Sequence, residues 1–104
     1  MKKKNQGLLP QKLLSLRKKS KLTQKDLAEV MGVSVGMYSK IELGERAVKS
    51  EQIPKLAHTL NIDASTISSL YLADTFYREV SNYPKEVVGR ALDILRDNIN
   101  PLLQ

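Results

Sequence analysis

Two short helical segments follow one another between Thr23 and Gly44, and they constrain the possible folds more than any other feature of the chain. Thr23 is a favourable helix N-cap, and Asp26 stands three residues later, so the two predict a capping box. Gly32 suits the left-handed end of this helix, and Ser34 suits the N-cap of the next one. We therefore predict helices over 24–31 and 35–43, joined by a tight turn.

Apolar residues recur with helical spacing on both sides of this pair. The pattern predicts helices over about 9–19, 53–60 and 64–80, with a polar loop over 45–50. Pro54 is tolerated in a first helical turn, and Asp63 is placed to cap the helix that follows it. A last helix is expected from Pro84 to about Ile99, where the dipeptide at 100–101, Asn-Pro, should stop it. No strand pattern of useful length is present, so the predicted fold class is all-α.

Composition excludes several classes of site. The 104 residues contain no cysteine and one histidine, His58, so neither a disulfide framework nor a zinc site is expected, and no cofactor is predicted. A Gly-rich phosphate loop and an evident pair of catalytic carboxylates are also missing, which argues against an enzyme. No run of about 20 apolar residues occurs, and we expect a soluble cytoplasmic protein without a membrane partner.

The net charge of +6 is distributed unevenly. Residues 1–21 hold eight basic residues and no acidic one, whereas residues 22–104 hold nine bases and eleven acids. The N-terminal lysines are Lys2, Lys3, Lys4, Lys12, Lys18, Lys19 and Lys21. Such a segment can attract phosphates, an anionic membrane surface or an acidic protein, or can simply increase solubility.

The stretch from Leu16 to Asp63 resembles the helix-turn-helix domain of phage-repressor and Cro-like regulators, the XRE type. The residues that carry the resemblance are Leu16-Arg17, Leu22-Thr23-Gln24, Leu27-Ala28, Gly32-Val33-Ser34, Tyr38 to Glu42, Gly44, and the helix from Ile53 to Leu60 with Asn61-Ile62-Asp63 after it. The resemblance implies a five-helix repressor-like domain, here over residues 8–72. A basic arm over 1–7 would precede it, and an additional helical extension over 73–104 would follow.

The resemblance also implies that the segment 35–43 is the recognition helix of a dimeric repressor, which binds a palindromic operator in double-stranded DNA. Tyr38, Ile41 and Glu42 share one face of this helix and should point into the core. The opposite face presents the predicted base contacts, namely Val35, Gly36, Ser39 and Lys40. A lysine can donate to guanine, and a valine can contact a thymine methyl group. Gly36 departs from the larger side chains common there in the family.

Other positions are assigned from the resemblance. Four residues are predicted to contact DNA phosphates, namely Gln24, Ser34, Arg46 and Lys49. For Arg46 and Lys49, simple solvation is the alternative. Arg17 and Glu42 are implied to form a structural ion pair.

The C-terminal extension carries an apolar stripe with helical spacing, made of Val88, Ala91, Leu92, Leu95 and Ile99. The stripe either packs back on the domain or pairs with a second subunit, and we favour contacts in a homodimer. A different hypothesis is an antitoxin or adaptor whose tail binds a partner protein and which regulates its own promoter. A third is an RNA or membrane-surface protein that binds through the N-terminal lysines.

Overall fold

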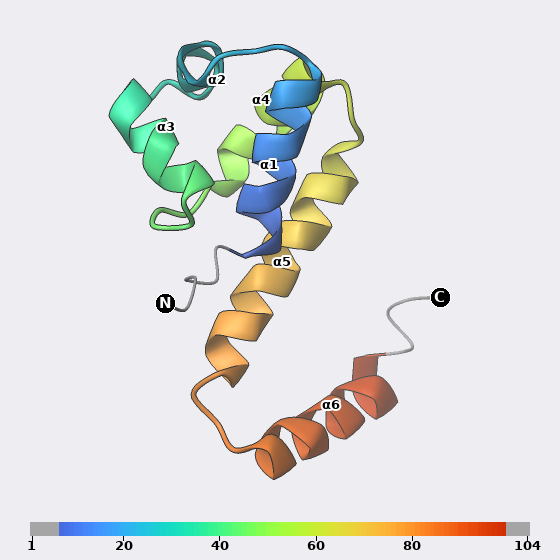
Figure 1. Cartoon of the computed structure of the whole chain (residues 1–104). Coiled ribbons are helices and arrows are strands. Elements are labelled where there is room, and N and C mark those ends of the chain that lie inside the picture. The colour runs from blue at the N-terminus through green and yellow to red at the C-terminus, as the bar shows by residue number, and fades with distance from the viewer. Residues whose placement is uncertain (1–6, 100–104) are drawn as a thin grey trace. The chain divides into compact units, whose positions relative to one another are not determined.

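The computed structural model describes residues 7–99, and in this range the chain is all-α, as predicted. Figure 1 shows the helices in chain order. Their bounds are α1 (Leu8–Lys19), α2 (Gln24–Met31), α3 (Val35–Glu42), the 3-10 turn η1 (Ser50–Gln52), α4 (Ile53–Leu60), α5 (Ala64–Val80) and α6 (Lys85–Ile99). The predicted plan of five helices with one additional C-terminal helix is confirmed. The predicted arm over 1–7, except Gly7, and the predicted stop at 100–101 lie outside the described residues.

The caps of α2 and α3 form as the sequence predicts. Thr23 Oγ1 accepts a hydrogen bond of 3.0 Å from Asp26 N, and Asp26 Oδ2 accepts one of 2.8 Å from Thr23 N, which completes the capping box. Gly32 ends α2 with φ 73°, a left-handed conformation that favours glycine. Ser34 Oγ accepts from Met37 N at 3.0 Å and caps α3. These local bonds set the tight turn between the two helices.

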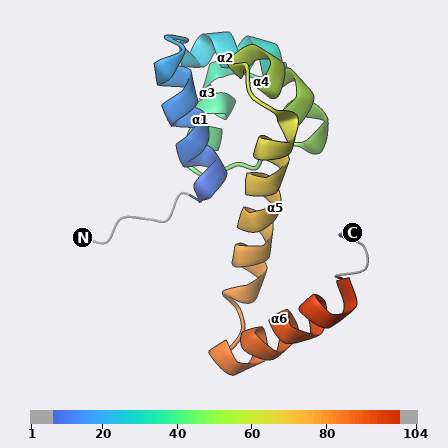
Figure 2. The same cartoon turned by 90° about the vertical axis from the view of Figure 1, so that its right-hand side faces the viewer.

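The core lies between the first five helices, which Figures 1 and 2 show from two sides. Each of these helices contributes one fully buried large side chain, namely Leu13, Leu27, Tyr38, Leu56 and Ile67. Further buried residues surround them, including Leu9, Ala28, Ile41, Val48, Ile53 and Leu60. The side of α3 that carries Tyr38, Ile41 and Glu42 therefore packs into the core. The opposite side of α3 remains available for contact with a ligand.

The segment between α3 and α4 differs from the predicted loop over 45–50. Its end is wound into η1, and Gln52 anchors it through two bonds: Gln52 Oε1 accepts from Lys49 N at 2.8 Å, and Gln52 Nε2 donates to Met31 O at 3.3 Å. Val48 is buried within the core. The prediction missed this turn, which is held by one local bond and by one contact with the distant end of α2.

The chain divides into two compact units, residues 1–74 and 75–104. The described part of the first unit holds α1 to α4 and the first part of α5, and that of the second holds the end of α5 and α6. In α6 no described residue is buried, and Arg96 pairs with Asp93 at 3.1 Å on its surface. No helix in the described range combines the length and apolar character needed to cross a membrane.

Candidate nucleic-acid interface

The exposed face of α3, defined here as Val35, Gly36, Ser39, Lys40 and Leu43, is the first component of the candidate site. Val35 and Lys40 are exposed, and Ser39 is half-buried. Tyr38, Ile41 and Glu42 are buried on the other side of the helix. The structure therefore separates the two faces of α3 as the helical spacing predicts. Leu43, which closes α3 as its C-cap, belongs to the same exposed face.

Gly36 lies on this face without a packing reason for glycine. A Cβ atom built there would come no nearer than 4.0 Å to Ser34 Oγ, which is ordinary contact. A glycine inside a helix costs about 1 kcal/mol relative to alanine. The internal contacts of the described chain do not explain that cost, and the exposed face has no side chain at this position.

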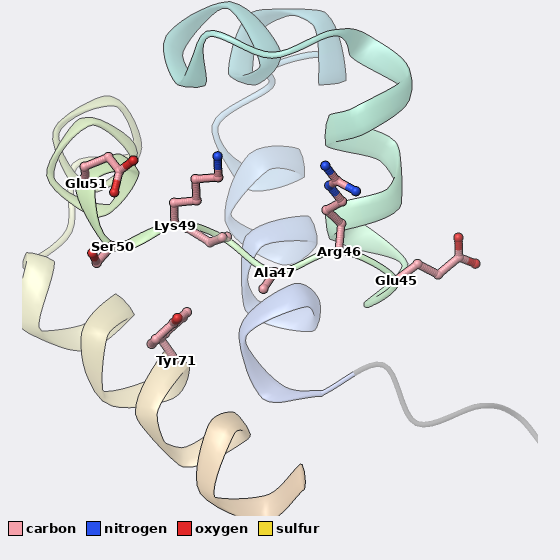
Figure 3. A pocket seen from close by; sticks show the side chains of 8 residues that line it. Glu45, Arg46, Ala47, Lys49, Ser50, Glu51 and Tyr71 are labelled. Atoms are coloured by element: carbon pink, nitrogen blue, oxygen red, sulfur yellow. The ribbon is translucent and has the colours of Figure 1, made fainter. Parts of the chain in front are cut away.

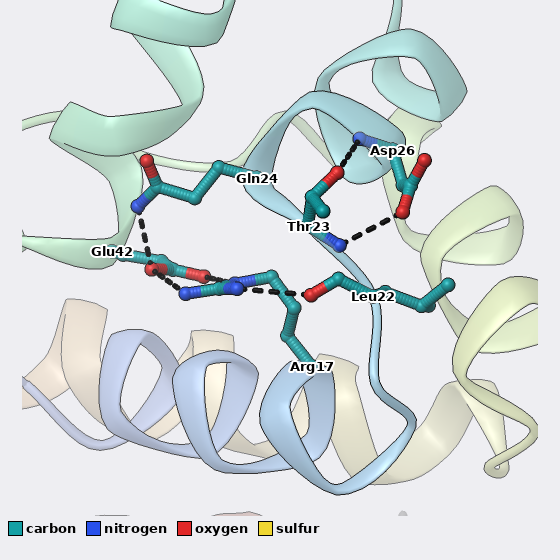
Figure 4. A network of polar contacts seen from close by, with 6 residues as sticks. All are labelled: Arg17, Leu22, Thr23, Gln24, Asp26 and Glu42. Atoms are coloured by element: carbon teal, nitrogen blue, oxygen red, sulfur yellow. Dashed lines mark hydrogen bonds and ion pairs between the residues drawn. The ribbon is translucent and has the colours of Figure 1, made fainter.

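A buried polar cluster fixes α3 against α1 and α2, and Figure 4 shows its members. Arg17 Nε lies 2.6 Å from Glu42 Oε2, and Arg17 Nη2 donates to Glu42 Oε1 at 3.2 Å. Arg17 Nη1 also donates to Leu22 O at 3.0 Å. The side chains of Arg17 and Glu42 are 13% and 5% exposed, respectively. The two-bond geometry of the guanidinium and carboxylate fixes both the distance and the orientation of the helices.

Gln24 extends this cluster into the first turn of α2. Its Nε2 atom donates to Glu42 Oε1 at 2.9 Å, so the Glu42 carboxylate receives bonds from α1 and α2 together. The sequence prediction placed Gln24 at the DNA backbone and did not include this bond. No local pattern indicates it, because the two residues come from different helices that only the folded core brings together.

The cluster controls the protonation of its members. Burial raises the pKa of the Glu42 carboxyl group, but hydrogen bonds from Arg17 and Gln24 and the charge of Arg17 lower it more, so the net pKa falls below the ordinary value. Burial, and then the contact with Glu42, raise the pKa of the Tyr38 phenol. Glu42 is therefore a carboxylate and Tyr38 a neutral phenol near neutral pH. Arg17 and Glu42 therefore form a structural ion pair, and neither Glu42 nor Tyr38 is poised to transfer a proton.

The loop after α3 supplies the basic part of the candidate site. Arg46 and Lys49 are exposed, and Figure 3 shows both side chains extending from this loop, with Tyr71 of α5 close by. The residues between Glu45 and Glu51 and the ring of Tyr71 line an open groove of about 590 Å³. The groove is wide open to solvent, and its polar lining suits a charged surface contact better than an enclosed small molecule.

The structure brings together the predicted residues of the first unit in one region. Ser34 caps α3, Val35 and Gly36 begin it, and Ser39 and Lys40 follow on it. Arg46 and Lys49 come from the next loop. Arg17 and Glu42 hold this region from inside. The stripe residues Val88 to Ile99 lie on α6 in the second unit. Among the described residues, no group of His, Cys, Asp or Glu is arranged to hold a metal ion.

The sequence of the first unit matches a known protein family. A helix-turn-helix family model (HTH_3) matches residues 13–67, which is more than half of the chain. The chain belongs to the Cro/C1-type helix-turn-helix family. This is a family of DNA-binding transcription regulators, so α2 and α3 are its helix-turn-helix and the prediction of a DNA-binding regulator is confirmed.

Solved structures support the same fold. A crystal structure of the clp gene regulator ClgR from Corynebacterium glutamicum is 28% identical, with a TM-score of 0.54, and the match covers 65% of this chain and 88% of that one. A second ClgR crystal structure, 24% identical with a TM-score of 0.56, matches 88% of this chain and 95% of its own length. The second match supports the fold alone. A comparison with curated protein sequences found no match.

Proposed function

We propose that the protein is a dimeric repressor that binds a palindromic operator, with α3 placed in the major groove of double-stranded DNA. The observation that carries the proposal is the exposed face of α3, which projects from a helix fixed by the Arg17–Glu42 pair. A major groove about 12 Å wide accommodates one α-helix. A helix held rigidly from inside loses little conformational freedom when it binds there, which favours specific contacts.

The proposed base contacts are Val35, Gly36, Ser39 and Lys40. The Lys40 ammonium group is the charged donor on this face and suits the O6 or N7 acceptors of guanine. Val35 offers methyl groups to a thymine methyl, and Ser39 has a hydroxyl group for a base or a phosphate. Gly36 removes a side chain from the face and so allows close approach of the helix backbone to the base edges.

The proposed phosphate contacts retain free hydrogen-bonding capacity after the internal bonds are counted. Gln24 Nε2 uses one N–H on Glu42, and an amide nitrogen carries two, so one remains for a phosphate oxygen. Ser34 Oγ accepts from Met37 N, and its own O–H remains as a donor. Arg46 and Lys49 add two exposed positive charges, whose contribution should weaken as salt increases.

The proposed dimer contacts are the apolar stripe residues of α6. Leu92 and Leu95 are 45% and 43% exposed, and no described residue of the helix is buried. Val88, Ala91 and Ile99 complete the stripe by helical spacing. A two-fold dimer would cover this surface on both copies and would present two α3 helices to two half-sites.

Replacement of Lys40 by alanine tests the role of α3. Because Lys40 would contact a base, Lys40→Ala should reduce affinity for the operator by about 1–3 kcal/mol and reduce affinity for random DNA much less. Affinities for both DNAs are measured at one fixed salt concentration. Lys55→Ala is the matched control, because it removes the same charge from an exposed position on α4. An equal loss on operator and random DNA for Lys40→Ala would contradict the role.

A further inference from the structure

Leu43 is a large apolar side chain exposed on the face of α3 that carries the proposed base contacts. It is 49% exposed and takes no part in the core cluster. Gly36 and Leu43 are seven positions apart, which is close to two helical turns, so both lie in one row along the helix. Lys40 lies between them on the same face. This row therefore has no side chain at Gly36, a positive charge at Lys40 and a large apolar side chain at Leu43.

The backbone that carries Leu43 is held firmly at the end of α3. Leu43 N donates to Ser39 O at 3.1 Å, Gly44 N to Ile41 O at 3.1 Å, and Glu45 N to Lys40 O at 2.9 Å. Gly44 has φ 80°, the left-handed conformation that closes a helix. Leu43 is therefore presented from a fixed position, in contrast to an exposed residue in an extended loop.

The chemistry of the exposed face narrows what Leu43 can recognise. Val35 and Leu43 are its two large apolar side chains, at 44% and 49% exposure, and neither can hydrogen-bond to a base edge. The one apolar group that a base pair presents in the major groove is the 5-methyl group of thymine. An apolar side chain at this place gains free energy by covering that methyl group and gains nothing from a cytosine at the same position.

We propose that Leu43 contacts a thymine 5-methyl group and is a second apolar determinant of the operator sequence. The inference rests on the proposed placement of α3 in the major groove. Val35 and Leu43 are eight residues apart, or about 12 Å along the helix axis. The two recognised thymines are therefore expected at different base pairs of one half-site. The base contacted by Lys40 lies between them.

Replacement of single thymines by deoxyuridine tests the inference, because this substitution removes only the methyl group. The operator is first obtained by selection with the full-length protein, and each thymine of a half-site is then replaced in turn. Wild-type affinity should fall about fourfold at each of two positions, which corresponds to about 0.8 kcal/mol for one buried methyl group. Leu43→Ala should lose sensitivity at one of these positions, and Val35→Ala at the other.

The controls separate this inference from a general loss of binding. Leu8→Ala makes the same substitution at an exposed leucine on α1 and should keep the complete wild-type deoxyuridine profile. If Leu43→Ala also keeps that profile, or loses affinity without losing sensitivity at one particular thymine, the inference is wrong while operator binding stands. If the wild-type protein selects no sequence, the proposed function and this inference both fail.

Discussion

Glu42 is the residue on which the position of α3 most depends. Its carboxylate is 5% exposed and receives bonds from Arg17 and Gln24, so three helices meet at one buried charge. A buried charge is costly unless it is paired and hydrogen-bonded, and removal of one partner leaves the other uncompensated. The pair therefore specifies one arrangement of the helices more than it adds net stability.

The pH dependence of unfolding should reveal this charge. The pKa of Glu42 is lowered in the folded protein, so its contribution is complete above the ordinary value of 4.5 and is lost as pH falls through the lower folded pKa. Glu42→Gln should reduce the free energy of unfolding by up to about 3–5 kcal/mol at neutral pH. The difference from wild type should shrink as pH falls below 4.5 and through the folded pKa, because a protonated Glu42 resembles glutamine. Urea unfolding at several pH values measures it.

Glu45→Gln provides the control for that experiment, because Glu45 is exposed and close in sequence. Its stability difference from wild type should stay small at every pH. A stability difference for Glu42→Gln that does not change with pH would contradict the assignment of a buried carboxylate.

The sequence predicted some members of this buried polar cluster but not all of its bonds. The inward placement of Glu42 followed from its helical spacing with Tyr38 and Ile41, which share its buried face. The bond from Gln24 did not follow, because it depends on the crossing of α2 and α3 and on one rotamer of a flexible side chain. Residue positions on a helix are a local property, whereas contacts between side chains of different helices are not.

At the scale of elements, Asp74 of α5 caps the start of α1. Its two carboxylate oxygens accept bonds of 2.8 Å from Leu8 N and 2.9 Å from Leu9 N. The N-cap residue of α1 is Gly7, which has no side chain for this purpose. At φ 92°, a Cβ atom on Gly7 would lie 3.0 Å from Asp74 Oδ2. Glycine is thus needed both for the backbone conformation and for the approach of the carboxylate.

Removal of this cap should loosen the attachment of α1. Asp74→Ala leaves two backbone donors without their acceptor and removes a negative charge from a helix N-terminus, so a loss of about 0.5–2 kcal/mol in unfolding free energy is expected. Asp74→Asn keeps one acceptor oxygen and should lose less. Glu79→Ala, an exposed acid on the same helix, is the control. Urea midpoints for Asp74→Ala that equal those of wild type would show that the cap adds no stability.

The difference between this cap and those of α2 and α3 shows what a sequence reveals about elements. Thr23 and Ser34 cap helices that begin beside them, so a short pattern predicted both. Asp74 acts on a helix 66 positions earlier in the chain, and η1 depends similarly on a bond from Gln52 to Met31. A short sequence pattern carries no information on either of these two long-range bonds. The cap of α1 and the turn η1 were accordingly missed, whereas the caps of α2 and α3 were predicted.

At the scale of the whole molecule, the sequence predicted the class of fold and the family. Helical spacing predicted the six helices, and each of the first five contributes one fully buried large side chain to the core. The excess of positive charge near the N-terminus does not account for the proposed sequence specificity, because the proposed base contacts lie on a helix face with one charged residue, Lys40. Affinity would come instead from the phosphate contacts around α3, and specificity from its exposed face.

Selection from a random library of double-stranded DNA by the full-length protein tests the central claim most directly. A dimeric repressor of this fold should enrich an inverted repeat whose half-site centres are one helical turn, about 10 base pairs, or a multiple of it apart. Selection by the wild-type protein of such a repeat is the predicted result. Enrichment of no sequence, or of a single site without two-fold symmetry, would contradict the claim that a symmetric pair of α3 helices binds the operator.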